Sequence, residues 1–220
     1  MCWKFKKIMK LNYSILLVDD HMVVRKGIAL VLKNEFEGVT LYNAENYIEA
    51  IEIVKTINLD VVLLDINING VEDIKIIKEI KAIQPLVKIL IFSSHDEKQY
   101  GLRYVQQGAD GYLNKFCSEE TIVDAVNKII TEGSYLSRNI KEKLNEKKNK
   151  KISNNPVDSL SNREYEIAVL LVNGLGNLEI SNKLNIQMST VSTYKNRVYE
   201  KLNINNVVAL SELLKGNSSL

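Results

Sequence analysis

The sequence contains little of what several protein classes need. It has two cysteines, Cys2 and Cys117, two prolines and ten glycines in 220 residues. Two cysteines are too few for a disulfide scaffold and are typical of a reducing compartment. The glycine and proline content excludes a collagen. Apolar runs such as residues 61–64 are far shorter than the ~18 residues of a membrane span. The first ten residues lack the apolar core of a secretory signal. We therefore expect a cytoplasmic protein.

The net charge of +2 hides a split along the chain. Residues 14–136 contain 12 basic and 19 acidic side chains, whereas residues 137–220 contain 13 basic and 8 acidic ones. This asymmetry predicts two domains with different partners, of which the basic one suits a polyanion such as nucleic acid. A basic solvated surface is the alternative interpretation.

The segment between the two parts reads KEKLNEKKNKKISNNP over residues 141–156. It is dense in Lys and Asn and almost free of large apolar residues, so it cannot bury a core. We therefore predict a flexible basic linker over residues 137–156.

Short apolar runs alternate with helical patterns in the first part. Most of the runs are continuous, as expected of strands that are buried on both faces. The five predicted strands span residues 15–18, 39–42, 61–64, 89–92 and 111–113. Strands that alternate with helices predict an α/β fold, a parallel sheet covered on both sides.

Polar residues follow these strands at the edge of the sheet where ligands bind. Asp19 and Asp20 follow the first strand, and Asp65 follows the third. Ser93 and Lys115 follow the fourth and fifth. Converging carboxylates repel one another, and a hard cation such as Mg²⁺ relieves that repulsion. A central carboxylate beside a metal, a lysine and a hydroxyl can accept a phosphoryl group. A helix cap or a surface charge is the alternative for any one of them alone.

Four segments resemble a known family: LLVDDH, VVLLDI, ILIFSSHDE and GADGYLNK. In order, spacing and position, they are similar to the receiver domain of two-component response regulators over roughly residues 13–135. The resemblance implies a flavodoxin-like, doubly wound five-stranded parallel sheet. It also implies that Asp65 is the phosphoacceptor and that Mg²⁺ binds to Asp19, Asp20, Asp65 and the backbone carbonyl of Asn67.

The resemblance implies a switch as well. Ser93 is similar to the hydroxyl that moves to the phosphoryl group, and Lys115 to the lysine that pairs with that group. Tyr112 stands at the position of the switch aromatic residue. His21 and His95 flank the acidic edge, and we interpret them as ordinary surface histidines.

Three residues depart from the family pattern. Asn69 and Phe116 stand where proline is usual, and Asp73 stands where glycine is usual. Asn69 loosens the loop after the phosphoacceptor, and Phe116 disfavours a cis peptide bond after the lysine. These changes affect the expected rate and stability of phosphorylation, since no reacting group is lost.

The last part predicts a small domain of helices. Ser161 and Glu164 form a capping box at the start of one helix, and Gly174 ends it. A second short helix and a tight turn lead to a third helix over about residues 189–202, whose outer face is polar and basic. This is the geometry that places a recognition helix in the major groove. A three-helix domain for protein contacts is the alternative.

The segment LSNREYEIAVLLVNGLGNLEISNKLNIQMSTVSTYKNRVYEKLNI resembles the LuxR/FixJ-type helix-turn-helix over roughly residues 156–216. Three residues match positions that face bases in that family: Ser192, Thr193 and Asn196. Four others are better placed for phosphates: Thr190, Lys195, Arg197 and Lys201.

Together the two parts resemble a response regulator of the NarL/FixJ class. We predict a receiver over residues 13–136 and a DNA-binding domain over 157–220. A sensor histidine kinase or a histidine phosphotransfer domain phosphorylates Asp65, and a homodimer then binds double-stranded promoter DNA. The protein is not expected to be an enzyme beyond autodephosphorylation. Two alternatives stay open, a regulator that ignores phosphorylation and a Mg²⁺-dependent aspartyl phosphohydrolase. The second would need an acid/base Asp where the chain has Asn67.

Overall fold

The computed structural model describes residues 12–66, 73–149 and 156–215. The chain divides into two compact units, residues 1–149 and 150–220. The first unit consists of β1 (Ser14–Val18), α1 (Met22–Glu35), β2 (Thr40–Ala44), α2 (Tyr47–Thr56), β3 (Val61–Leu64), α3 (Asp73–Ile83), β4 (Lys88–Ser93), α4 (Glu97–Gln106), β5 (Gly111–Asn114), α5 (Glu119–Glu132) and α6 (Arg138–Asn149).

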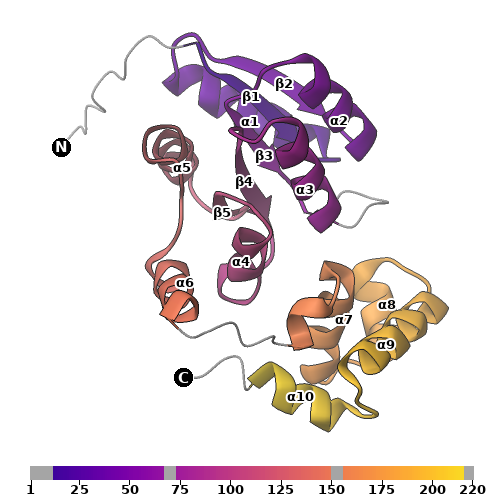
Figure 1. The fold of residues 1–220 in the computed structure, drawn as a ribbon. Coiled ribbons are helices and arrows are strands. Elements are labelled where there is room, and N and C mark those ends of the chain that lie inside the picture. Colours follow the sequence, from indigo (N-terminus) through magenta and orange to yellow (C-terminus); the bar gives the residue numbers. More distant parts are fainter. Residues whose placement is uncertain (1–11, 67–72, 150–155, 216–220) are drawn as a thin grey trace. The chain divides into compact units, whose positions relative to one another are not determined.

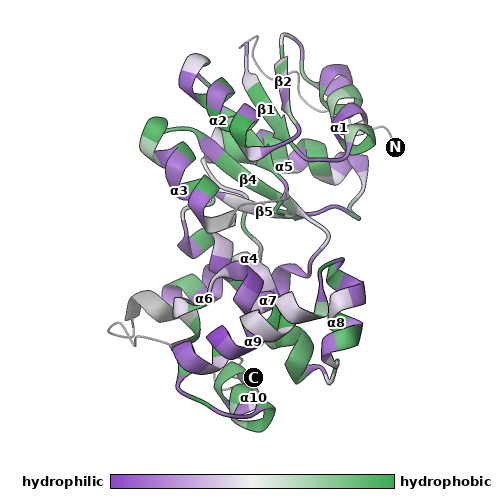
Figure 2. Ribbon diagram, turned by 90° about the vertical axis from the view of Figure 1, so that its right-hand side faces the viewer, coloured by the Kyte–Doolittle hydropathy of each residue, from purple (hydrophilic) through white to green (hydrophobic). Residues whose placement is uncertain are grey.

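The five strands form one parallel sheet in the order β2-β1-β3-β4-β5. Every residue of β3 is buried, as are the last four residues of β1. Hydrophobic residues run along these strands, as Figure 2 shows, because both faces of the sheet are covered. The predicted α/β fold with a five-stranded parallel sheet is confirmed.

The helices cover the two faces of the sheet. Alternate strand residues such as Leu17, Leu63 and Phe92 pack with Ile28 of α1 and Val126 of α5 in one core. Helices α2, α3 and α4 lie on the opposite face (Figure 1). The carboxyl ends of the strands therefore stay open between the helices, at one edge of the sheet.

Helix α6 is the main difference from the sequence prediction. Most of the predicted flexible linker over residues 137–156 is helical, from Arg138 to Asn149. Ile140 is only 3% exposed and packs toward Gly101 of α4. Arg138 and Glu142 form an ion pair one turn apart on the exposed side. Composition predicted that the segment has no core of its own, whereas the helix packs its Ile140 against the neighbouring helix α4.

The second unit is helical. It consists of a 3₁₀ turn, η1 (Pro156–Ser159), followed by α7 (Asn162–Val172), α8 (Asn177–Leu184), α9 (Met188–Leu202) and α10 (Val207–Lys215). Helix α7 begins with the predicted capping box of Ser161 and Glu164. Gly174 has a φ of 87°, the left-handed conformation that ends the helix.

Helices α8 and α9 pack on α7 around one apolar core. Val191, Val198 and Leu202 form the buried side of α9, as the sequence pattern predicts. The tight turn between α8 and α9 starts at Asn185, whose φ is 49°. No helix in the described part of the chain is both long and apolar enough to cross a membrane.

Candidate functional site

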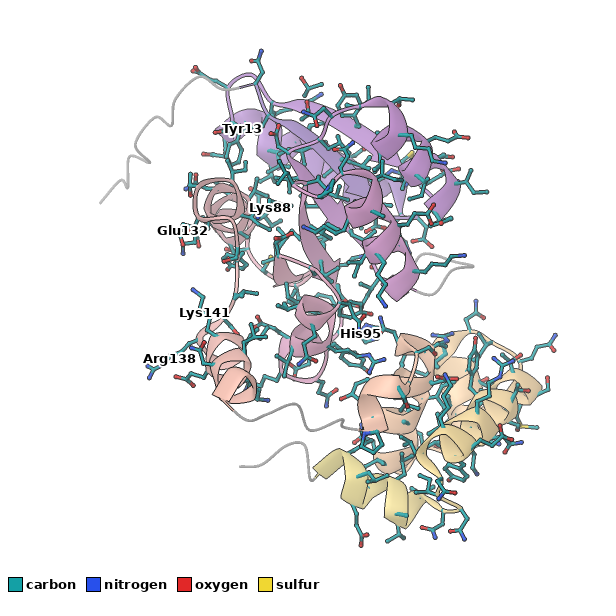
Figure 3. All side chains as sticks on the ribbon, viewed as in Figure 1. Tyr13, Lys88, His95, Glu132, Arg138 and Lys141 are labelled. Atoms are coloured by element: carbon teal, nitrogen blue, oxygen red, sulfur yellow. The ribbon has the colours of Figure 1, made fainter. Side chains whose placement is uncertain are left out.

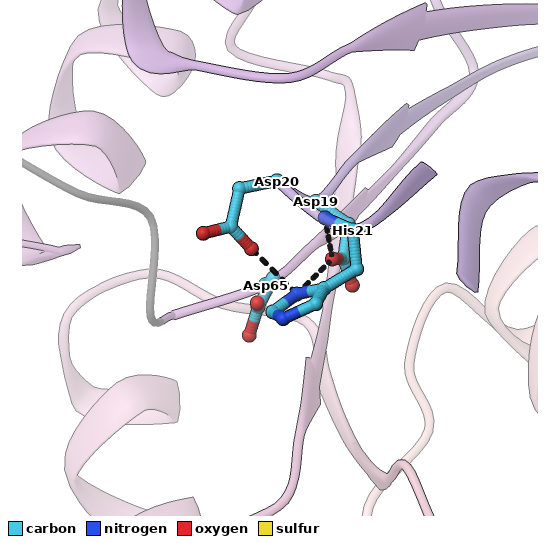
Figure 4. Close-up of side chains that lie close together, drawn as sticks. All are labelled: Asp19, Asp20, His21 and Asp65. Atoms are coloured by element: carbon cyan, nitrogen blue, oxygen red, sulfur yellow. Dashed lines mark hydrogen bonds and ion pairs between the residues drawn. The ribbon is translucent and has the colours of Figure 1, made fainter. Parts of the chain in front are cut away.

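Three carboxylates meet at the carboxyl edge of the sheet. Asp19 and Asp20 follow β1 and Asp65 follows β3, and these strands are paired so that Val18 lies beside Leu64. Asp19 and Asp65 are each 2% exposed. The ligand atoms of the three carboxylates and of His21 all lie within 4.8 Å of one another (Figure 4). The structure thus brings together the acidic residues that strand order predicts.

Lys115 lies between two of these carboxylates. Its Nζ is 2.7 Å from Asp19 Oδ2 and 2.8 Å from Asp65 Oδ2. Burial by itself would lower the pKa of Lys115, but the hydrogen bonds and charges of Asp19 and Asp65 outweigh burial and raise that pKa. The lysine therefore stays charged and places a positive group beside Asp65, where incoming phosphoryl oxygens would lie.

His21, interpreted from the sequence as a surface histidine, contacts two of the carboxylates. Its Nδ1 lies 2.6 Å from Asp20 Oδ1 and 3.2 Å from Asp19 Oδ1, and its backbone N–H donates to Asp19 Oδ1. The ring itself is largely exposed. In the sequence, only the adjacency of His21 to two aspartates hints at this contact.

The donor set of this cluster fits Mg²⁺. Carboxylate oxygens are the ligands that this ion prefers, and Asp19, Asp20 and Asp65 present them from two adjacent strands. Two of the three carboxylates are buried, and charged groups there need a cationic partner. Asn67, whose backbone carbonyl was predicted to be a fourth ligand, lies outside the described residues.

The two predicted switch residues are fully buried. Ser93 ends β4 and is 0% exposed, and Tyr112 of β5 is 1% exposed. Burial raises the pKa of Tyr112 to about 12, which keeps the phenol protonated. That phenol donates to the backbone carbonyl of His95 at 3.0 Å. His95, interpreted from sequence as a surface residue, contacts Ser93 Oγ through Nδ1 at 3.2 Å.

The three departures from the family pattern have different surroundings. Asn69 lies outside the described residues, and Asp73 begins α3. Phe116 is 83% exposed, and all peptide bonds between described residues are trans. Phe116 therefore changes the rim of the site and leaves the contacts of Lys115 with the two carboxylates in place.

Helix α9 carries all seven residues predicted to bind DNA. Thr193, Asn196 and Arg197 are exposed, and Thr190 and Lys195 are half-buried. Arg197 lies over the ring of Tyr194 at 5.7 Å, and Lys195 lies over that of Tyr199 at 5.6 Å.

Two residues of the predicted DNA-binding set form hydrogen bonds with side chains of other helices of the unit. Ser192 Oγ accepts a hydrogen bond from Asn177 of α8 at 3.1 Å. Lys201 Nζ donates to Glu164 Oε2 at 2.6 Å, and Glu164 is 3% exposed. Glu164 also accepts from the backbone of Ser161. Lys201 thus connects α9 to α7, a role that residue type alone does not distinguish from phosphate binding.

Family comparisons agree with both units. Residues 15–127 match the model of the response regulator receiver domain, and residues 158–214 match that of the LuxR family of bacterial regulatory proteins. The chain is a response regulator of the NarL/FixJ class. This response regulator is 34% identical over 204 residues to the Fimbriae Z protein of Escherichia coli strain K12, which covers 92% of this chain and 96% of that protein.

Other relatives support the same assignment. The response regulator GacA of Pseudomonas aeruginosa is 32% identical over 202 residues, which covers 91% of this chain and 94% of GacA. Among solved structures, RcsB from Salmonella enterica serovar Typhimurium, bound to the rprA promoter with the phosphomimetic BeF₃⁻, superposes with a TM-score of 0.57. It is 24% identical and covers 93% of this response regulator and 99% of the RcsB chain. RcsB thus shows that the fold is shared.

Proposed function

We propose that this response regulator is a transcription factor switched by phosphorylation of Asp65. The observation that carries the proposal is the placement of Lys115 Nζ within 2.8 Å of both Asp65 and Asp19. A buried carboxylate nucleophile, an adjacent fixed cation and a cluster of metal-ligand oxygens are the parts that phosphoryl transfer to aspartate requires.

The chain's own residues account for the transfer step. Asp65 Oδ attacks the phosphorus of a phosphohistidine, the P–O bond forms, and the P–N bond of the donor breaks. The electron pair stays on the donor imidazole, which takes a proton. Lys115 holds one phosphoryl oxygen, and Ser93 donates a hydrogen bond to another. Mg²⁺ held by Asp19, Asp20 and Asp65 would neutralise the charge that develops on these oxygens.

The partner on the donor side is a sensor histidine kinase or a histidine phosphotransfer domain. On the output side, exposed polar residues of α9 contact double-stranded promoter DNA. RcsB is described as dimers bound to DNA, which supports a homodimer on two half-sites about one helical turn apart. The protein acts in the cytoplasm and catalyses nothing beyond loss of its own phosphate.

The test is phosphorylation by acetyl phosphate with Mg²⁺, read on a phosphate-affinity gel. The wild-type chain should give a shifted band, and Asp65→Asn should give none while it keeps its helical circular dichroism. A shifted band in both would place the phosphate elsewhere. No shift in the folded wild type would favour a regulator that works without phosphorylation. Steady release of phosphate from small phosphoesters would favour the phosphohydrolase.

A further inference from the structure

His95 lies between the switch serine and helix α4, in the loop after β4 (Figure 3). Its backbone N–H donates to Ser93 Oγ at 3.1 Å, and its Nδ1 lies 3.2 Å from the same oxygen. On the other side its ring lies 4.8 Å from the ring of Tyr100, at an angle of 38°. One side chain thus contacts both the switch hydroxyl and the helix that follows it.

The rest of His95 is fixed from β5. Its backbone carbonyl accepts hydrogen bonds from Tyr112 Oη and from Asn114 Nδ2, each at 3.0 Å. A residue held at its amide, its carbonyl and its ring cannot move without changing the surroundings of Tyr112 and Tyr100.

The Ser93 hydroxyl has a single proton to donate. Its oxygen already accepts from the backbone N–H of His95, and its neighbours with lone pairs include His95 Nδ1 and the Tyr112 oxygen. A neutral imidazole nitrogen is an in-plane acceptor and a stronger base than a phenol oxygen. In the tautomer that carries its proton on Nε2, Nδ1 can accept this hydrogen bond from the hydroxyl.

We propose that His95 is a positioning residue for the switch, since its imidazole holds the Ser93 hydroxyl in the unphosphorylated arrangement. This inference rests on the proposed function, because Ser93 must donate to a phosphoryl oxygen once Asp65 is modified. The hydroxyl cannot donate to both acceptors, so each phosphorylation event breaks the Ser93–His95 hydrogen bond and releases the ring beside Tyr100.

The test uses His95→Phe in the full chain. Phenylalanine keeps a ring against Tyr100 and removes Nδ1. Beryllofluoride is the probe, as a mimic of the phosphoryl group on Asp65, and hydrogen exchange of residues 93–100 reports its binding. The midpoint concentration should fall about fivefold, the effect of one net hydrogen bond that no longer opposes binding. His95→Asn, whose side-chain oxygen can accept where Nδ1 lies, should keep the wild-type midpoint.

The serine supplies the decisive control. In a Ser93→Ala background, His95→Phe should leave the midpoint unchanged, because the hydroxyl that His95 holds is gone. An unchanged midpoint for His95→Phe in the wild-type background, or an equal fall in the Ser93→Ala background, would overturn the role of His95 alone. If beryllofluoride left the hydrogen exchange of the wild-type chain unchanged, the proposed function would be overturned and this inference with it.

Discussion

Lys201 shows how one residue type fits two different roles. A lysine on the recognition helix suits a DNA phosphate, yet its Nζ lies 2.6 Å from a carboxylate that is 3% exposed. Burial would raise the pKa of Glu164, but the hydrogen bonds from Lys201 and Ser161 outweigh it and lower that pKa below the ordinary 4.5. The ion pair therefore stabilises the packing of α9 on α7 in the second unit.

We predict that Lys201→Met destabilises this unit by about 2 kcal/mol at neutral pH, the value for a hydrogen bond to a charged group. In the wild type, the contribution of Glu164 is present above its ordinary pKa and is lost as the pH falls through the lower pKa of the folded state. Urea unfolding of the full chain at pH 7 and pH 3.5 measures both. Lys195→Met is the matched control on the same helix, and equal destabilisation by the two variants would contradict the prediction.

Contacts between side chains could be predicted from the sequence only where the order of the strands brings the residues together. The strand-end positions of Asp19, Asp65 and Lys115 predict that these side chains meet, because parallel strands end at one edge. The partners of Lys201 and His95 depend on which helices and loops pack together. Strand order and helical periodicity do not specify those contacts.

Helix α6 is a whole element that the sequence pattern did not predict, because its packing depends on another helix. Its sequence has Lys and Asn in place of an apolar stripe, and a 12-residue helix is marginal on its own. Its Ile140 is buried and lies so near α4 that a Cβ atom on Gly101 would meet Ile140 Cδ1 at 2.7 Å. Arg138 and Lys141 lie on the exposed side of the helix (Figure 3). The strands were predictable because they are short apolar runs, and α1, α2 and α5 because their apolar residues recur at helical spacing.

We predict that Ile140→Ala releases α6 from α4, because truncation of a buried isoleucine costs about 2–5 kcal/mol. Hydrogen exchange over residues 138–149 should become faster, while exchange in β1 and β3 stays as in the wild type. Arg138→Gln is the control, since it removes an exposed ion pair worth about 0.3–0.5 kcal/mol. If both variants exchange alike, Ile140 does not hold the helix.

The whole molecule joins a receiver unit to a helical DNA-binding unit. Both units, and their order, were predictable from the two sets of motifs, whereas much of the basic charge after residue 136 lies in α6 of the first unit. The surroundings of the switch were less predictable, because the sequence interpretation placed His95 on the surface, whereas its ring and backbone contact Ser93 and Tyr112.

At the scale of the whole molecule, we predict that residues of α9 that contact bases and those that contact phosphates differ in how they affect the salt dependence of DNA affinity. Asn196→Ala should narrow the affinity gap between selected and random DNA duplexes, at a cost of about 1–3 kcal/mol on the selected one. Lys195→Gln should weaken both duplexes alike and reduce the slope of log affinity against log salt by about 1. Fluorescence anisotropy over a range of salt concentrations measures both, and parallel behaviour of the two variants would contradict the division.

Ile140, a buried apolar side chain of α6, also affects how far the second unit can reach. As a helix, its 12 residues span about 18 Å, at 1.5 Å per residue. Fully extended, the same residues would span about 40 Å. When the tether becomes twice as long, the effective concentration of one copy's DNA-binding unit near that of the other copy falls. The packing of Ile140 on α4 thus affects the entropic cost of bringing two DNA-binding units together on neighbouring half-sites.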